Sequence, residues 1–351
     1  MPTPSLKIEL PSHDELFELL VRVTDLFENS NAEYRPKNSD GSIGGLLDFR
    51  NDADIRLPLM IVPDLHARFD FFNNILNFKL PTDFICPSNA SDNSNIAYTS
   101  APLTVFEALQ KRLLRLICVG DGLHSEARGK TRWLKAWDDF CNGKNAGKSM
   151  KEEMAEGLSL MRLVIECKCK FPEVFHFLKG NHENIESLES GGDFPFHKFV
   201  QESLMTRRFM VEYYGDDILY LYSCFEKDLP LIALFDNCIV SHAEPIRAFR
   251  FEELTEGRNN AEVVKGLTWT NNGESEPESA EIMLKNLTCD GKNGIKSFYF
   301  AGHRPIPGKY NIADGRRFVQ IHNPESQNVV LVYPDRVFNP ETDIVSVREE
   351  I

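Results

Sequence analysis

Five short apolar segments of this chain each run into a residue that can bind a cation or transfer a proton. The segments are LPLMIVPDLH, RLICVGDG, VFHFLKGNHE, NCIVSHAEP and KSFYFAGHRP. Apolar runs of this length predict buried strands, and open α/β sheets bind ligands at the carboxyl ends of their strands. The pattern therefore predicts an α/β fold with a polar site built from strand ends. The residues at those ends are Asp64, His66, Asp121, Asn181, His182, His242 and His303.

The order of helical and strand patterns indicates how the sheets are built. Early strands alternate with helical periodicity, whereas ILYLYSC, PLIALF and NCIVSHAEP read as strands that follow one another directly, and RRFVQIH and NVVLVYP form a closing pair. This order favours two packed mixed β-sheets flanked by helices, a mixed α/β (α+β) architecture. Helices are expected over residues 12–29, where Ser12 and Glu15 form a capping box, over 67–78, from about 103, in two pieces over 130–171, and over 194–211.

The composition shows no break that would divide the chain into two domains. We predict a single domain over residues 1–351, in which residues 1–56 are an N-terminal helical extension. Two further stretches, 81–102 and 122–171, are interpreted as insertions between the strands. Loops that flank strand ends commonly determine which ligand enters a site, so we expect these insertions to wall it.

The chain is acidic, with 53 Asp and Glu against 39 Lys and Arg and a formal net charge of -14. This charge argues against binding to long nucleic acids. No apolar run approaches the ~20 residues that span a bilayer, and the N-terminus has no basic segment followed by an apolar one. The eight cysteines follow neither zinc-site nor disulfide spacing. We therefore expect a soluble, cytoplasmic protein with no membrane partner.

The strand-end residues combine carboxylate, amide and imidazole groups. This mixture suits borderline divalent metals such as Mn, Fe or Zn. Six such ligands, one of them a carboxylate that two ions share, are enough to hold two metal ions. Ordinary loop chemistry does not explain why Asp, Asn and His blocks recur in this order.

The blocks PDLH, GDGLH, GNHE, SHAEP and GHRP, in this order, resemble the motifs of the calcineurin-like metallophosphoesterase superfamily over about residues 58–333. The stretch LPLIALFDNCIVSHAEP, followed by GLTWTNN, is similar to the phosphoprotein-phosphatase branch of that superfamily. The resemblance implies a metallophosphoesterase-like sandwich. It also implies a phosphoesterase with two metal ions, in which a metal-bridging hydroxide attacks a phosphomonoester.

The same resemblance implies a role for each strand-end residue. His182 would be the general acid that protonates the leaving oxygen, a task that suits an imidazole near neutral pH. The implied ligands are Asp64 and His66 for metal 1, Asp121 as the bridge between the ions, and Asn181, His242 and His303 for metal 2.

The second block departs from the phosphoprotein-phosphatase pattern. That branch has Gly-Asp-x-x-Asp-Arg-Gly, whereas this chain has His124 and Ser125 in place of the second Asp and the phosphate-binding Arg. We hypothesise that Glu126 orients His182 in the missing Asp's stead. His124 or a nearby Arg is then expected to contact phosphate.

Residues beside the ligands complete the predicted site. Arg304 and Arg68 adjoin metal ligands and could clamp a phosphate with two parallel hydrogen bonds each. In a related branch with Gly-His-x-His the last His binds metal 1, but Pro305 occupies that position here. The resemblance therefore predicts a sparse metal-1 shell.

Two other functions stay open on the sequence alone. A phosphodiesterase or dinucleotide hydrolase would use the same metal pair. A catalytically degenerate module that only binds a phosphorylated partner is compatible with His124 and Ser125. The identity of the phosphorylated substrate has no signature in the chain, because the predicted insertions are chemically generic.

Overall fold

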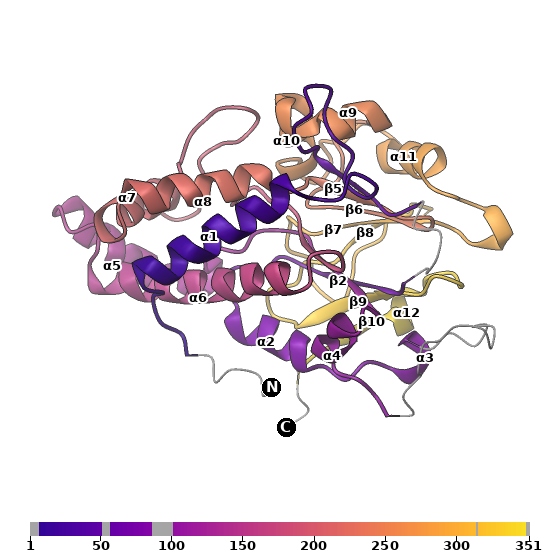
Figure 1. Ribbon diagram of the computed structural model, residues 1–351, viewed down its shortest axis with the longest axis horizontal. Coiled ribbons are helices and arrows are strands. Elements are labelled where there is room, and N and C mark those ends of the chain that lie inside the picture. Colours follow the sequence, from indigo (N-terminus) through magenta and orange to yellow (C-terminus); the bar gives the residue numbers. More distant parts are fainter. Residues whose placement is uncertain (1–6, 51–56, 86–100, 314, 349–351) are drawn as a thin grey trace.

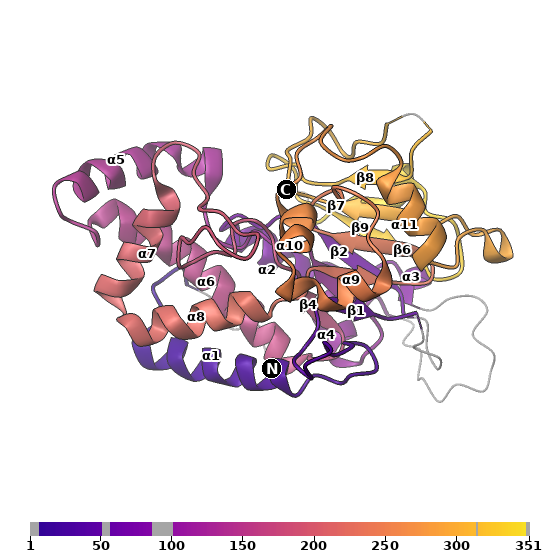
Figure 2. The same cartoon turned by 90° about the horizontal axis from the view of Figure 1, so that it is seen from above.

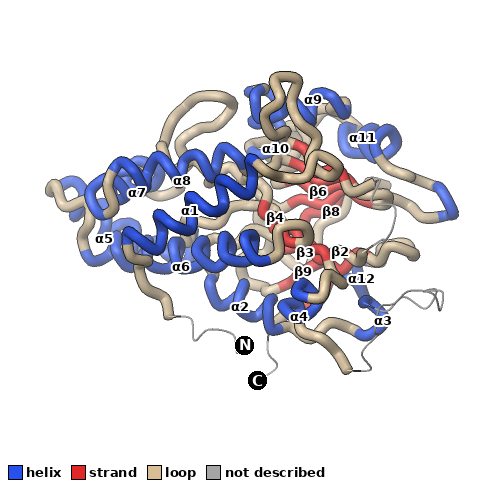
Figure 3. Tube along the Cα trace, in the orientation of Figure 1, coloured by secondary structure: helices blue, strands red, loops and turns tan. Residues whose placement is uncertain are grey.

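Two five-stranded sheets lie face to face in the centre of the molecule, with helices on their outer faces (Figures 1 and 3). The coordinates are a computed structural model that describes residues 7–50, 57–85, 101–313 and 315–348. None of the helices in these ranges is long and apolar enough to cross a membrane. The first sheet has the order β1 (Leu46–Asp48), β5 (Ile232–Leu234), β6 (Cys238–Ser241), β7 (Phe298–Ala301) and β8 (Phe318–Gln320). The second has the order β10 (Ile344–Ser346), β9 (Asn328–Val332), β2 (Leu59–Val62), β3 (Arg115–Cys118) and β4 (Phe175–Phe177).

Each sheet contains a run of three parallel strands. β6, β7 and β8 are parallel neighbours in the first sheet, and β2, β3 and β4 are parallel neighbours in the second. The pairs β5–β6 and β2–β9 are antiparallel. Because parallel neighbours end at the same edge, each run gathers the residues that follow its three strands.

The strands alternate their side chains between two cores. In β3, Leu116 packs with helices outside the second sheet, whereas Ile117 packs between the sheets, as does Val119 directly after the strand. In β7, Phe300 packs between the sheets and Tyr299 packs outside the first sheet. Both faces of each sheet are thus apolar, which explains why these strands read as continuous hydrophobic runs.

A large group of helices covers the outer face of the second sheet, and a smaller group covers the first (Figure 2). The large group comprises α1 (His13–Glu28), α2 (Phe69–Asn77), α4 (Val105–Gln110), α5 (Lys130–Cys141), α6 (Lys148–Lys170), α7 (Glu202–Tyr213) and α8 (Asp216–Asp228). The smaller group comprises α9 (Phe251–Thr255), α10 (Ala261–Thr268) and α11 (Ser279–Leu287). Two single-turn helices, α3 (Thr82–Ile85) and α12 (Pro340–Asp343), lie near the ends of strands.

The predicted fold class, two mixed sheets flanked by helices, is confirmed. The expected capping box opens α1, where the Ser12 N–H donates to the Glu15 carboxylate at 2.8 Å. Residues 122–171, predicted as an insertion, include α5 and α6, which pack into the core outside the second sheet. Of the predicted insertion at 81–102, residues 86–100 lie outside the described residues.

Three elements differ from the sequence prediction. The segment ILYLYSC, predicted as a strand, lies in α8, because Ile218, Leu219, Tyr222 and Phe225 are buried at helical spacing. The helix predicted over residues 194–211 begins only at Glu202. β1 lies within the predicted helical extension and forms an edge strand beside β5.

Replacing Ile117 with Ala should lower the free energy of unfolding by about 2–5 kcal/mol, because the side chain is fully buried between the sheets and its loss leaves a cavity. Urea denaturation of the purified protein measures this change. Leu134→Ala, at a position 44% exposed on α5, is the control and should change stability by less than about 0.5 kcal/mol. Equal losses for both variants would contradict the placement of Ile117.

Candidate metal centre

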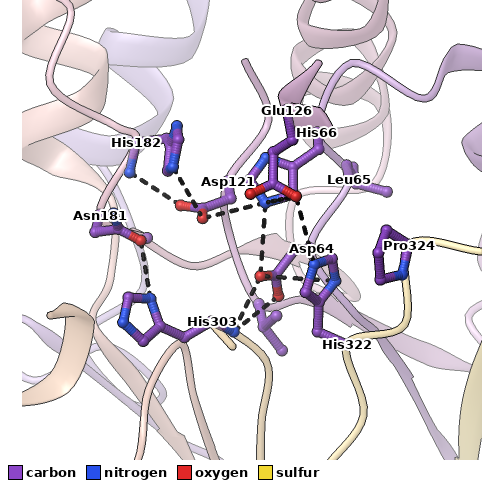
Figure 4. A network of polar contacts seen from close by, with 12 residues as sticks. Asp64, Leu65, His66, Asp121, Glu126, Asn181, His182, His303, His322 and Pro324 are labelled. Atoms are coloured by element: carbon purple, nitrogen blue, oxygen red, sulfur yellow. Dashed lines mark hydrogen bonds and ion pairs between the residues drawn. The ribbon is translucent and has the colours of Figure 1, made fainter. Parts of the chain in front are cut away.

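The strand ends bring all seven predicted residues to one place, between the carboxyl edges of the two sheets (Figure 4). Figure 4 shows the side chains of six of them, all except His242, gathered around one centre. The second sheet supplies Asp64 and His66 after β2, Asp121 after β3, and Asn181 and His182 after β4, while the first supplies His242 after β6 and His303 after β7.

The carboxylate of Asp121 lies in the middle of the cluster. Its Oδ2 atom is 3.5 Å from His242 Nε2, 3.6 Å from His66 Nε2 and 3.8 Å from His182 Nε2. These separations are too long for hydrogen bonds. Its Oδ1 atom accepts a hydrogen bond of 2.9 Å from the backbone N–H of His182. The buried Oδ2 atom therefore faces three imidazoles without bonding to any of them.

On one side of Asp121, an amide oxygen and two imidazoles converge. Asn181 Oδ1 is 3.0 Å from both His242 Nε2 and His303 Nδ1, and the two ring nitrogens are 3.2 Å apart. His303 Nε2 is buried and has no hydrogen-bond partner. These are the residues that the resemblance assigns to metal 2.

The protonation of His242 shows why a cation fits here. Its Nδ1 lies 3.0 Å from the carbonyl oxygen of Val119, which can only accept, so Nδ1 carries the proton. Burial lowers the pKa of His242, which keeps the ring neutral. The lone pair of Nε2 then faces the oxygen atoms of Asn181 and Asp121, and these acceptors repel one another unless a cation lies among them.

His66 is prepared in the same way on the other side of Asp121. Its Nδ1 lies 3.2 Å from the carbonyl oxygen of His124, and its Nε2 is 3.8 Å from Asp64 Oδ2. Burial lowers the pKa of His66 to about 3. Burial, together with the nearby carboxylates of Glu183 and Asp64, raises the pKa of Asp121 well above its usual value. A bound cation would favour the neutral imidazole and the ionised carboxylates together.

Two further donors lie beside His66, and the prediction missed them as donors. Glu126 Oε2 is 3.6 Å from His66 Nε2, and His322 Nδ1 is 3.8 Å from Asp64 Oδ2. We predicted a sparse metal-1 shell because Pro305 stands where a related branch has a histidine ligand. The presence of two more side chains that could bind a metal here differs from that prediction. The sequence carried a signal for His322, because RRFVQIH is also an apolar run that ends in a histidine.

The loops that carry these residues are tightly constrained. Six non-glycine residues at the site have backbones in the left-handed region, which costs ~1–3 kcal/mol each and is common at functional sites. A Cβ atom on Gly302 would lie 1.8 Å from Asp64 Oδ1, and one on Gly180 would lie 2.2 Å from Asp121 Oδ1. Only glycine lets these loops approach the carboxylates so closely. The six residues are His66, Ala67, Asp121, His124, Glu126 and His303.

Comparisons with known proteins agree with this architecture. No protein-family model matches the chain, and no curated protein matches its sequence. Among solved structures, it is similar to a protein serine/threonine phosphatase from Saccharomyces cerevisiae with similarity to human phosphatase PP5, at a TM-score of 0.55 and 13% identity, over 96% of this chain and 90% of that one. The fold is that of a protein serine/threonine phosphatase. A cold-active protein-tyrosine phosphatase of a psychrophilic Shewanella is similar at a TM-score of 0.40 and 11% identity, over 87% of this chain and 82% of that one.

Within this phosphatase fold, Glu183 shapes the loop around Asp121. Its buried carboxylate accepts hydrogen bonds from the backbone N–H groups of Gly180 at 2.7 Å, Asp121 at 2.9 Å and Gly122 at 2.8 Å. The last residue of the GNHE block therefore fixes the backbone that carries Asp121. A glutamate at this position has a structural reason that is independent of catalysis.

The predicted general acid lies in a stack of rings. The centroid of the His182 ring is 4.9 Å from that of His124 and 4.6 Å from that of Phe196, and the latter two are 5.4 Å apart, so the three rings form one cluster. His124 Nε2 is 3.8 Å from the carboxylate of Glu202. Burial raises the pKa of Glu202, but the side chain of His124 and hydrogen bonds from the backbone N–H groups of Lys198 and Phe199 lower it to about 2.

Glu126 does not make the contact with His182 that the hypothesis gave it, whereas the contact of His124 with phosphate stays a prediction. Glu126 makes no hydrogen bond to His182, and it accepts one of 2.6 Å from Lys198 instead. The ring of His124 is buried against Trp133, with the ring centroids 5.2 Å apart, and it also stacks on the ring of His182. Stacking thus replaces the carboxylate contact that was expected to orient His182.

The two arginines beside the predicted metal ligands have different contacts. Arg68 donates to the backbone carbonyls of Leu65 at 3.0 Å and Pro324 at 3.1 Å, and to that of Asp64, so its guanidinium joins loops and differs from the predicted phosphate clamp. Arg304 is exposed and donates to the side chain of Asn271.

Ser125, which stands in place of the expected Arg, is buried. Its N–H and hydroxyl donate to the carboxylate of Glu153 at 2.8 and 2.7 Å. Ser125 is therefore committed to the protein interior and offers no donor to a phosphate.

Replacing Glu183 with Ala should destabilise the protein by about 3 kcal/mol or more, because it leaves three buried N–H groups unsatisfied at ~1–3 kcal/mol each. Chemical denaturation measures the loss. The exposed Glu189→Ala is the matched control and should be near neutral. Unchanged stability in the Glu183 variant would show that these hydrogen bonds do not hold the loop.

Proposed function

We propose that the protein is a metal-dependent phosphatase that hydrolyses phosphomonoesters at the Asp121 centre. The observation that carries this proposal is the set of buried imidazole nitrogens that converge on Asp121 Oδ2 at 3.5–3.8 Å, distances longer than hydrogen bonds. These atoms lie at the carboxyl edges of both sheets. The fold alone does not define an activity, so the proposal rests on the donor set.

The residues present fit two divalent ions. Two such ions, when bound, neutralise the charge of a phosphate ester and lower the pKa of water. The donor set contains both oxygen and imidazole nitrogen, which suits Mn, Fe or Zn. Asp64 and His66 would hold metal 1, Asp121 would bridge, and Asn181, His242 and His303 would hold metal 2.

His182 is suited to protonate the leaving oxygen. Its side chain is 11% exposed, whereas those of His66 and His242 are 4% and 0% exposed, so it borders the opening of the site. Its ring packs against those of His124 and Phe196, and its Nε2 is 3.8 Å from Asp121 Oδ2. A general acid in this position acts on the group that departs from phosphorus.

A cavity of about 600 Å³ beside Arg304 supports a substrate larger than inorganic phosphate. Asn271 lies in its wall and accepts a hydrogen bond from Arg304. Phe194 and Trp269 pack edge to face on the same wall, and Lys265 lies among them. Arg304 would orient the phosphate, and this cavity would receive the leaving group.

One observation favours a binding module without turnover. Ser125 occupies the position of a phosphate-binding Arg and is fully engaged by Glu153. A site that lacks this cation would hold phosphate mainly through its metals. The experiments below separate the two proposals.

The Asp121→Asn variant should lose at least ~100-fold in kcat toward p-nitrophenyl phosphate assayed with Mn²⁺, because it removes charge from the atom that both ions would share. Asp138→Asn, on the exposed surface of α5, is the control and should keep wild-type activity. Assaying bis(p-nitrophenyl) phosphate alongside tests the diesterase alternative. Binding of phosphate without turnover of either ester would support the binding module and refute the phosphatase.

The His182→Ala variant should lose ~10²–10⁴-fold in kcat toward phenyl phosphate, whose leaving group needs a proton, and much less toward p-nitrophenyl phosphate. The exposed His197→Ala should change neither rate. Equal losses with both esters would mean that His182 does not act as the general acid.

A further inference from the structure

We propose that Glu126 and His322 are additional metal ligands, so that five side chains of this protein enclose the metal-1 side of the centre. This inference rests on the proposed two-metal function and deepens it. The metal-1 donors would be Asp64, His66, Asp121, Glu126 and His322. Three of them are carboxylates and two are imidazoles.

The burial of His322 is the first observation. Its side chain is 0% exposed, and neither ring nitrogen has a hydrogen-bond partner. Nδ1 is 3.8 Å from Asp64 Oδ2, and Nε2 is 3.8 Å from Glu126 Oε2. A buried imidazole that makes no hydrogen bond is costly, so its position between two carboxylates needs an explanation. A cation among these groups provides one.

The conformation of Glu126 is the second observation. Its backbone φ angle is 52°, which lies in the left-handed region. Glycine adopts this region with less strain than any residue with a side chain, so a glutamate here carries a conformational cost. Its Oε1 atom accepts a hydrogen bond of 2.6 Å from Lys198, which leaves Oε2 directed at His66. Lys198 thus aims one oxygen of this carboxylate into the centre.

The distances fit a shared ion better than direct contacts. Two donors that each lie ~2.0–2.3 Å from one ion can be no more than ~4.6 Å apart. Glu126 Oε2 and His66 Nε2 are 3.6 Å apart, and His322 Nδ1 and Asp64 Oδ2 are 3.8 Å apart, so each pair could share an ion. The 3.8 Å contact between His322 and Glu126 involves the other ring nitrogen, Nε2, which cannot bind the same ion as Nδ1. The same separations exceed the length of a hydrogen bond.

The loop that carries His322 is fastened to the loop that carries Asp64. Arg68 donates to the backbone carbonyls of Leu65 and Pro324, which belong to these two loops. The carbonyl of His322 accepts a hydrogen bond of 2.9 Å from Ile306. These contacts hold His322 rigidly against Asp64, as a preorganised ligand set requires.

The extra ligands predict that the two ions bind unequally. With three carboxylates, metal 1 would be held more tightly than metal 2, which has Asp121, an amide and two imidazoles. Metal 1 would also have fewer positions left for a phosphate oxygen. Substrate would then be bound mainly on the metal-2 side, where Arg304 directly follows the ligand His303 in the chain.

Metal binding to the full chain tests the assignment directly. The protein is stripped with a chelator and titrated with Mn²⁺ by calorimetry, and bound metal is counted by elemental analysis. The wild type should bind two ions. His322→Ala and Glu126→Gln should each weaken one of the two by ~10–100-fold in Kd and leave the other unchanged. His303→Ala should weaken the other ion, and His197→Ala neither.

His322→Gln provides a second variant in case the Ala variant does not fold, and circular dichroism verifies its structure. Absorption spectra of the Co²⁺-loaded protein should change in His322→Gln, because one nitrogen ligand is lost. Two ions bound with wild-type Kd values and an unchanged cobalt spectrum would overturn the assignment. Two ions with the expected weakening, but no hydrolysis of any ester, would refute the proposed function and leave the ligands in place.

Discussion

Electron-rich atoms crowd around Asp121 in the buried centre, and the residues around them must hold these atoms together against their mutual repulsion. The carboxylate, the amide of Asn181 and the lone pair of His242 lie together in a buried space, and hydrogen bonds to backbone carbonyls direct the imidazole proton away from them. A protein gains nothing from this arrangement unless positive charge is present. The left-handed backbones, the close glycines and the three hydrogen bonds of Glu183 all serve to hold these atoms in place.

The departures from the phosphoprotein-phosphatase pattern form a connected set. His124 replaces a carboxylate and stacks on His182, while Glu202 lies behind it. Ser125 replaces an arginine and turns inward to Glu153. Glu126 then points into the centre from a position where that branch has glycine. One short segment has therefore exchanged contacts to substrate for contacts within the protein.

The sequence was sufficient for those parts of the site that depend on local pattern. Each predicted ligand follows an apolar run, and parallel strands gather their ends, so convergence followed from periodicity and order. His322 obeys the same rule, but it was not predicted as a ligand because the residues around it match no motif of the resemblance. The partners of Arg68 and Glu126 were beyond reach, because they lie 256 and 72 residues away. α8 was mistaken for a strand because its aromatic residues favour strands locally, whereas packing against α1 decided its form.

The proposed metal ligands come from both sheets. This division has a consequence for the lifetime of the protein. Asp64, Asp121 and Asn181 follow strands of one sheet, whereas His242, His303 and His322 follow strands of the other. An ion held by both groups cross-links the two halves of the sandwich. Free metal at 1,000 times its dissociation constant would add about 4 kcal/mol to the folded state. The abundance of the protein would thus follow the supply of metal, independently of any reaction that it catalyses.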